Sequence, residues 1–237
     1  MARSKSSTNT TTTSRKRKNI EDKEEPSLKK PFTQAESLFN NYKDEVECIG
    51  PDGVVNFCKD LGFDCDSIHI LILAWKMGAS KQGYFTKGEF LKGFESLGCY
   101  DLTTLKQQLL SLSDKLKNDS PKFSELYKFS FAFASEVDSK KSIDIQAASS
   151  MLQLILPDGP HTVNFVEFLR TQQQYKSINR DQWLCFLEFS KTVKSDLSNY
   201  DESEAWPLLI DEFVEHVKES SIAVNKEFYT EKKDDRY

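Results

Sequence analysis

Long apolar runs and paired cysteines are both missing from this 237-residue sequence. No segment approaches the roughly 20 apolar residues that a membrane-spanning helix needs, and the N-terminal region has no apolar signal core. The cysteines are odd in number, scattered and free of any Cys-x-x-Cys pair, which favours reduced thiols. They are Cys48, Cys58, Cys65, Cys99 and Cys185. We therefore expect a protein that neither enters a membrane nor is secreted.

The motifs of common enzyme classes are missing as well. The sequence has no phosphate-binding glycine loop, no Gly-x-Ser-x-Gly elbow and no zinc-ligand spacing. A ligase that forms a thioester would need a cysteine activated by a neighbouring base. Cys185 instead stands between Leu184 and Phe186 on an apolar helix, where burial makes a thiol inert. The sequence predicts a non-catalytic protein that requires no cofactor.

Strand-type alternation of polar and apolar residues is nearly absent, whereas helical periodicity extends through most of the chain. The sequence therefore predicts an all-α fold. Helices are expected near residues 34–48, 53–62, 66–77, 86–97, 102–117, 122–136, 144–156, 162–175, 180–196 and 203–219.

Several expected helices have suitable residues at their ends. Gly62, Gly78 and Gly98 follow helices, where a residue in the left-handed conformation ends the helix at little cost. Side chains at three other positions can accept from the free N–H groups of a first turn. These positions are Asp66, Asp101 and Ser203.

Two segments resemble calcium-binding EF-hand loops that have lost their ligands. In residues 78–89, Gly83 occupies the sharp turn and Glu89 the last position. In residues 156–167, Pro160 falls where a ligand belongs. The remaining ligand positions of the first loop hold Gly78, Ser80 and Gln82 in place of carboxylates. We expect metal-free, EF-hand-like helix–loop–helix units.

Composition divides the chain into a body and two polar ends. Residues 1–31 carry nine basic and four acidic side chains and few apolar ones, so they cannot bury enough surface to fold. We expect residues 1–32 to form a disordered basic tail and residues 33–219 a helical domain. Residues 220–237 mix Lys, Asp and Glu and are expected to form a second disordered tail.

Two basic clusters in the first tail are typical of a bipartite nuclear localisation signal. Basic runs also bind nucleic acid, but an acidic body would repel phosphate. We therefore expect nuclear import, with the cytoplasm left open as a second location, and no nucleic-acid binding. The clusters are Arg15, Lys16, Arg17 and Lys18, followed by Lys29 and Lys30.

The largest charge imbalance lies between Asp181 and Glu219. Ten carboxylates and three lysines give this segment a net charge of −7, although the whole chain carries only −5. Apolar residues recur within it at helical spacing, so one helix face is buried. The carboxylates opposite are either solvated or meet a Lys/Arg-rich partner. Charge alone leaves both interpretations open.

A long motif lies in this acidic segment. Residues 196–215 read Asp-Leu-Ser-Asn-Tyr-Asp-x-x-x-Ala-Trp-Pro-x-Leu-Ile-Asp-Glu-Phe-Val-Glu. This motif resembles the signature of the defective-in-cullin-neddylation family, and the resemblance extends over roughly residues 33–219. Further matching segments are Phe57–Gly62, Leu71–Lys76, Gly83–Thr86, Ile178–Trp183 and Leu187–Ser190.

The resemblance implies two binding sites. In the family, an acidic patch marked by an Asp–Ala–Asp trio receives a basic surface of the cullin C-terminal region. The trio falls here on Asp181, Ala205 and Asp211. A second site, a hydrophobic pocket, receives the N-acetylated initiator methionine of the conjugating enzyme of the neddylation pathway. Its positions match Val54, Ile70, Leu73, Gln82, Phe133, Met151 and Leu154.

The function that the resemblance implies is a scaffold-type co-ligase, which brings the modifier-charged conjugating enzyme to the cullin. The cullin-bound RING subunit is left open as a further partner. The basic tail resembles the subgroup that has a nuclear tail and no N-terminal ubiquitin-binding domain. Two alternatives remain: a metal-free, EF-hand-like nuclear adaptor without ligase-stimulating activity, and a basic-tailed chromatin protein.

Overall fold

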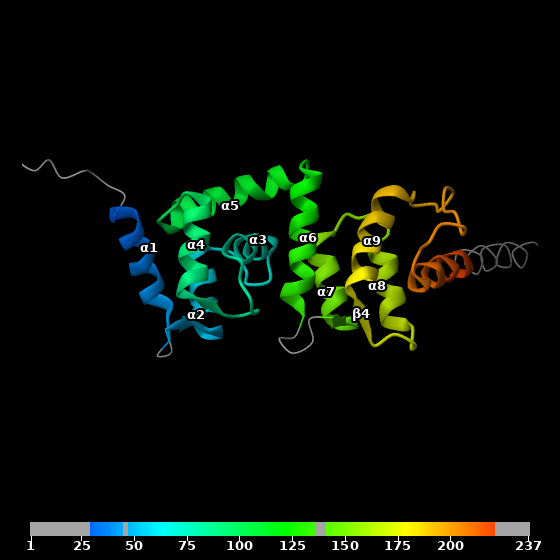
Figure 1. Cartoon of the computed structure of the whole chain (residues 1–237), viewed down its shortest axis with the longest axis horizontal. Coiled ribbons are helices and arrows are strands. Elements are labelled where there is room, and N and C mark those ends of the chain that lie inside the picture. Colours follow the sequence, from blue (N-terminus) through cyan, green and yellow to red (C-terminus); the bar gives the residue numbers. More distant parts are fainter. Residues whose placement is uncertain (1–28, 45–46, 136–140, 221–237) are drawn as a thin grey trace, which may run out of the picture.

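Helices dominate the computed structural model, which describes residues 29–44, 47–135 and 141–220. These residues form ten helices and four two- or three-residue strands. The helices are distributed along the long axis, from α1 at one end to a helix over residues 208–220 at the other (Figure 1). The expected all-α fold is therefore confirmed. None of the helices in the described ranges is long and apolar enough to cross a membrane.

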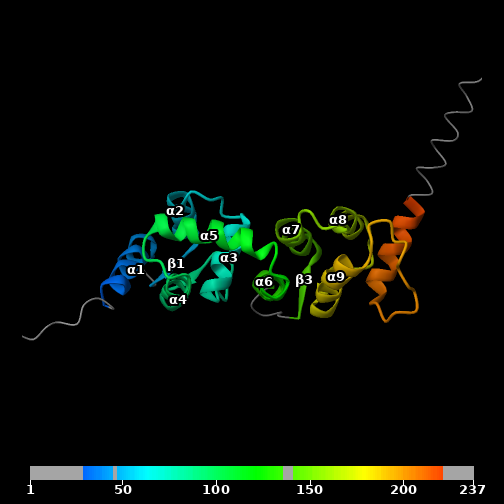
Figure 2. The same cartoon turned by 90° about the horizontal axis from the view of Figure 1, so that it is seen from above.

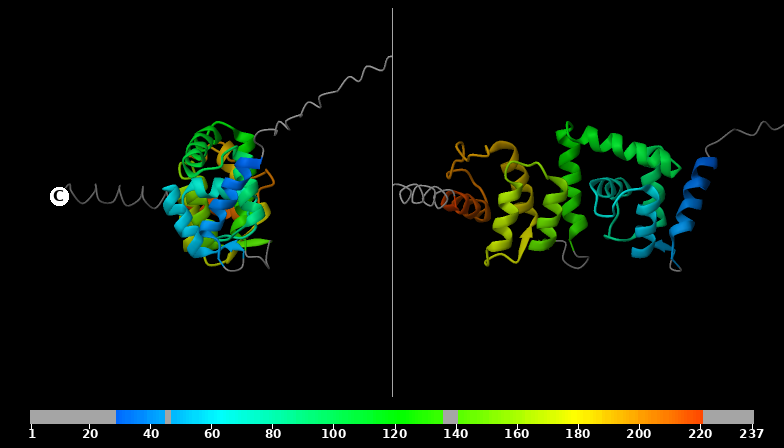
Figure 3. Two further views of the ribbon diagram at one scale, coloured as in Figure 1. Left: turned by 90° about the vertical axis from the view of Figure 1, so that its left-hand side faces the viewer. Right: turned by 180° about the vertical axis from the view of Figure 1, so that it is seen from behind.

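The first half of the chain contains α1 (Lys29–Tyr42), α2 (Pro51–Leu61), α3 (Ile68–Met77), α4 (Lys87–Leu97) and α5 (Leu102–Leu116). The second half contains α6 (Ser120–Ala134), α7 (Ile145–Ile155), α8 (Thr162–Thr171), α9 (Arg180–Thr192) and helix 208–220. The strands are β1 (Cys48–Ile49), β2 (Phe85–Thr86), β3 (Ser142–Asp144) and β4 (Ser177–Asn179). Helix α5 runs from the end of α4 across to α6 (Figure 3).

Each half is tied together by one short antiparallel strand pair. β1 pairs with β2, joining the α1–α2 and α3–α4 connections, with Ile49 opposite Phe85. β3 pairs with β4, joining the α6–α7 and α8–α9 connections, with Ile143 opposite Ile178. The expected loop at 78–89 contains β2, but the second loop was placed wrongly. Residues 156–161 form the turn between α7 and α8, and the second strand pair lies outside it.

Glu89 is the last residue of the loop at 78–89, and backbone N–H groups hold its carboxylate. The side chain accepts hydrogen bonds from the backbone N–H groups of Ser80 and Thr86, each at 2.8 Å. Burial alone would raise the pKa of Glu89, but these bonds outweigh it and lower the pKa. The carboxylate therefore anchors the loop to the first turn of α4. The expected absence of metal at this loop stays a prediction.

The helix ends follow the sequence in most cases. Gly62, Gly78 and Gly98 end α2, α3 and α4 with φ between 62° and 75°. The carboxylate of Asp101 accepts from the N–H of Thr104, as expected. Asp66 and Ser203 do not cap helices. Ser67 occupies the N-cap position of α3.

The last helix starts later than periodicity suggests. Asp201 accepts hydrogen bonds from both the N–H and the hydroxyl of Ser203, which fixes a local turn. The carbonyl of Pro207 then accepts from the N–H of Ile210 at 2.7 Å, and the helix begins at residue 208. An Asp side chain that bonds its own turn competes with helix formation.

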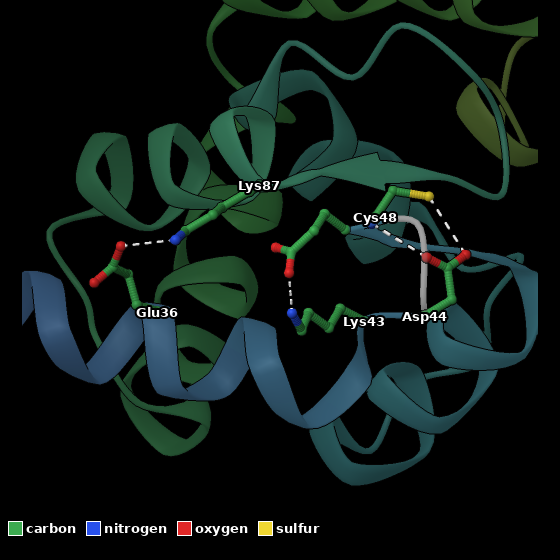
Figure 4. Close-up of polar contacts among 6 residues, drawn as sticks. Glu36, Lys43, Asp44, Cys48 and Lys87 are labelled. Carbon is green, nitrogen blue, oxygen red and sulfur yellow. Dashed lines mark hydrogen bonds and ion pairs between the residues drawn. The ribbon is translucent and has the colours of Figure 1, made fainter.

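Helix α1 is held to the first half by apolar and polar contacts. Phe39 packs edge-on against Phe90 at 5.7 Å between ring centroids. At the surface, Lys87 pairs with Glu36 at 3.0 Å, and Asp44 accepts from the N–H of Cys48 at 3.2 Å (Figure 4). α1 ends at Tyr42, earlier than expected, because residues 48–49 form β1. The segment at residues 1–28 lies outside the described residues.

Helix α6 joins the halves. It contacts α3 and α5 on one side and α7 and α9 on the other. Seen from above, α6 lies between the two groups of helices (Figure 2). The cores on either side are aromatic, with Phe57, Phe90 and Phe94 in the first half. Phe165, Phe186, Phe189 and Phe213 fill the second.

Helices α3 and α4 pack too closely for any side chain at Gly93. A methyl group there would lie 2.4 Å from Cγ of Met77. We expect Gly93→Ala to lower the free energy of unfolding by about 1–3 kcal/mol, as overpacking does. Gly88→Ala, on the same helix with open space around it, should instead raise stability by up to about 1 kcal/mol. Urea unfolding measures both, and equal midpoints for the two variants would contradict this packing.

Candidate functional site

A cavity of about 580 Å³ opens between the two halves. Its walls come from α2 and α3 on one side and from α6 and α7 on the other. Its volume lies within the range of roughly 300–1,000 Å³ that is usual for ligand pockets. Six of the seven residues expected in the hydrophobic pocket line it: Val54, Ile70, Gln82, Phe133, Met151 and Leu154.

Leu73 is the exception and requires a correction. Its side chain is fully buried in the core and does not line the cavity. Residues 70–74 of α3 are all buried, so the helix has no polar face there to show which side meets the cavity. Periodicity alone could not separate the cavity wall at Ile70 from the core at Leu73.

The mouth of the cavity is more polar than its floor. Asp66, Gln82 and Gln153 are exposed and lie on its lining. The Sγ of Cys65, also on the lining, approaches the carbonyl oxygen of Val54 at 4.0 Å. Gly83 has φ +77°, and a methyl group there would meet nothing within 4 Å. The cavity can therefore take an apolar group inside and hydrogen-bond a polar group at its mouth.

Sequence reasoning missed several lining residues, among them Cys65, Asp66, Leu71 and Gln153. The first two lie in the connection before α3, and Leu71 is adjacent to Ile70. Their nearness in sequence to expected pocket residues was the one available signal. Asp66 matters most, because a carboxylate at the mouth attracts a positively charged ligand.

The expected acidic site lies in the second half. Ala205 is exposed in the segment between α9 and helix 208–220, and Asp211 is half-buried near the start of that helix. The Oδ1 of Asp211 accepts a hydrogen bond from the hydroxyl of Tyr200. Asp181 is exposed in the first turn of α9. Tyr200 packs against Phe189 in the last turn of α9. Asp181 lies towards the start of that helix, about 12 Å from Phe189 along the helix axis.

A second tyrosine connects these parts of the surface. Tyr175, just before β4, donates to Glu212, the neighbour of Asp211. Burial and that bond raise the pKa of Tyr175 to about 12. Burial, the bond to Asp211 and the nearby Glu202 and Glu215 raise the pKa of Tyr200 as well. Both phenols therefore remain protonated donors at neutral pH and hold the carboxylates in fixed positions.

The acidic surface also carries exposed apolar area. The side chain of Leu208 is 65% exposed, three residues after Ala205. Trp206 between them packs edge-on against Phe189 at 5.6 Å, and its Nε1 is buried without a partner in the described structure. Neither Leu208 nor the two tyrosines was expected from the sequence, although Tyr200 and Leu208 lie within the motif. A partner here would meet carboxylates beside the exposed side chain of Leu208.

The rest of the expected site residues lie elsewhere. Arg15–Lys18 fall outside the described residues, and Lys29 and Lys30 begin α1. Among the described residues, no group of three or more His, Cys, Asp or Glu side chains could hold a metal ion.

Comparison with known proteins identifies the family of this chain. The family described as Cullin binding matches residues 104–216. DCN1-like protein 2 of Dictyostelium discoideum is 54% identical over 229 residues, covering 86% of this chain and 85% of that protein. Human DCN1-like protein 5 is 44% identical, covering 76% and 75%. Human DCN1-like protein 4 is also 44% identical, but this chain spans only 63% of its length. The chain therefore belongs to the DCN1-like, or defective-in-cullin-neddylation, family.

Proposed function

We propose that this protein promotes cullin neddylation as a scaffold that holds two partners at once. The observation that carries the proposal is the separation of two unlike sites. An apolar cavity lies between the halves, whereas Ala205 and Asp211 lie on an acidic surface of the second half. Holding both reactants in one complex replaces a bimolecular encounter by a local one. The acceptor lysine of the cullin then meets the thioester of the conjugating enzyme.

The cullin C-terminal region would bind the acidic surface. Asp181 and Asp211 can form charge-assisted hydrogen bonds to Lys or Arg side chains. The tyrosine bonds to Asp211 and Glu212 orient these carboxylates before the partner arrives. The exposed Leu208 and the small Ala205 would allow the cullin to make close apolar contact beside these carboxylates.

The conjugating enzyme would bind the cavity through its N-acetylated methionine. The walls are apolar at Val54, Ile70 and Met151, which suits a methionine side chain. Acetylation removes the ammonium charge, whose burial would be costly. Gln82 at the mouth can hydrogen-bond the acetylated amide.

The transfer would need no covalent intermediate on this protein. Burial, with the neighbouring Cys65 thiol, raises the pKa of Cys58 to about 12. Burial, with the nearby Asp101, raises the pKa of Cys99 to about 11. Burial and Asp181 also raise the pKa of Cys185. These three thiols are therefore poor nucleophiles at neutral pH.

A reconstituted neddylation reaction tests the proposal. Charged conjugating enzyme and cullin are mixed with and without this protein, and the initial rate of cullin modification is measured. We expect a large increase in rate when the protein is present. An unchanged rate, with both partners shown to bind, would instead support an adaptor without ligase-stimulating activity.

Charge reversal at the acidic surface tests the cullin site. We expect Asp211→Lys to weaken binding of a cullin C-terminal fragment by about 2–5 kcal/mol, because one partner of a close charge pair is lost. Asp158→Lys makes the same change at an exposed carboxylate outside the acidic segment, so its affinity should match the wild type. Calorimetric titration measures both, and full affinity in a folded Asp211→Lys protein would exclude this surface.

Paired peptides test the cavity. A free amino terminus has a pKa of about 8 and is mostly charged at pH 7, so we expect the acetylated peptide to bind more tightly. An uncompensated ammonium would cost about 2–3 kcal/mol, a factor of about 30–150. The carboxylate of Asp66 at the mouth offsets part of this cost, so Asp66→Asn should widen the preference.

The test variant is Leu154→Asp in the cavity wall. Its matched control is Val163→Asp, which lies outside the cavity and has a side chain that is 70% exposed. Fluorescence polarisation should show lost binding for the first and normal binding for the second. Equal affinities of the two peptides for the wild-type protein would contradict the proposed ligand.

We also propose that the basic clusters direct the protein to the nucleus. Alanine at residues 15–18 and at Lys29 and Lys30 should move a tagged protein to the cytoplasm. Alanine at Arg3, Lys5 and Lys23, basic residues outside the clusters, should leave it in the nucleus. Microscopy decides, and nuclear accumulation of the first variant would contradict the signal.

A further inference from the structure

Helix α6 is the element through which the two proposed sites are connected. Among the described residues, no other helix joins the halves as extensively. Phe133 and Ala134, in its last turn, line the cavity. Tyr127, earlier on the same helix, faces α9 and Trp183. α6 therefore contributes to the cavity at one point and meets the second core at another.

Tyr127 and Trp183 exchange hydrogen bonds across this contact. The hydroxyl of Tyr127 donates to the carbonyl oxygen of Trp183, and Nε1 of Trp183 donates to the carbonyl oxygen of Tyr127, both at 3.0 Å. Their rings stack at 4.7 Å with an angle of 20°. Both side chains are at most 1% exposed, so water cannot replace either bond.

The pair differs from ordinary core packing in being directional. Apolar contacts allow two helices to rotate or slide slightly, whereas two opposed hydrogen bonds fix both rotation and register. Burial raises the pKa of Tyr127 well above its usual value, so its hydroxyl remains a donor at physiological pH. Trp183 lies two residues from Asp181 in α9.

We infer that Tyr127 and Trp183 are positioning residues that fix the acidic surface relative to the cavity. The inference rests on the proposed scaffold function. Neither residue would touch a partner, since both are buried. They act by holding α9 at one angle to α6. Asp181 on α9 is thereby fixed relative to Phe133 on α6. The thioester and the acceptor lysine then meet in one geometry.

The kinetic test compares two Tyr→Phe variants of the full chain. Tyr127→Phe removes the hydroxyl bond between α6 and α9. Tyr42→Phe removes a hydroxyl bond to Asp60 within the first half. In the reconstituted reaction, we expect Tyr127→Phe to lower the stimulated kcat by about three- to tenfold, since even a 1 Å misplacement can cost about 100-fold. The KM values for both partners should be unchanged, and Tyr42→Phe should behave as wild type.

A stimulated kcat equal to wild type in folded Tyr127→Phe would overturn the inference. So would a fall in the apparent kcat that is fully explained by the fraction of unfolded protein, measured on the same sample by circular dichroism. If wild-type protein gave no stimulation, the proposed function itself would fail, which is a separate outcome.

A distance measurement tests the positioning without any partner. Nitroxide labels are placed on Val55→Cys beside the cavity and Glu188→Cys on α9, both exposed. Cys48, Cys65 and Cys185 are replaced by serine in this background. We expect one narrow distance distribution in the parent and in Tyr42→Phe. It should broaden in the Tyr127→Phe, Trp183→Phe double variant. An unchanged distribution in that variant would overturn the inference.

Discussion

The double hydrogen bond between Tyr127 and Trp183 is the constraint that fixes α9, and with it Asp181, relative to α6. Each half has its own strand pair and its own group of buried aromatic side chains. What remains to be fixed is the relation between them. Helix α6 supplies it by placing one face against α3 and α5 and another against α7 and α9.

The positions of the two proposed sites follow from the surfaces that each site needs. The cavity needs apolar walls from both halves, so it lies at their junction beside α6. The acidic surface needs water around its carboxylates, so it lies at the far end around helix 208–220 (Figure 1). Hydroxyls of Tyr175 and Tyr200 hold two of these carboxylates in place. The proposed scaffold function requires such separation, because each of the two proposed partners must bind without displacing the other.

Much of the fold could be predicted from the sequence, because its signals are local. Glycines at 62, 78 and 98 end helices through backbone conformations that other residues adopt at a cost. The misses arose where a local signal had competition. The sequence predicts Ser203 as a helix cap, but its N–H donates to the carboxylate of Asp201 and the segment forms a turn. The sequence predicts the second EF-hand-like loop at residues 156–167. In the structure, the second strand pair instead joins Ser142–Asp144 to Ser177–Asn179, which lie in two other connections.

The sequence by itself determined the helical class, the charge imbalance and the family motif, since each depends on residue type and spacing alone. Only the tertiary structure decided which buried residues face the cavity. Ile70 and Leu73 share one apolar helix, and the position of α7 opposite makes the first a wall and leaves the second in the core. It alone brought Asp66 to the cavity mouth and Tyr127 against Trp183, 56 residues away. Contacts between distant segments depend on how whole helices pack, and no local pattern encodes that packing.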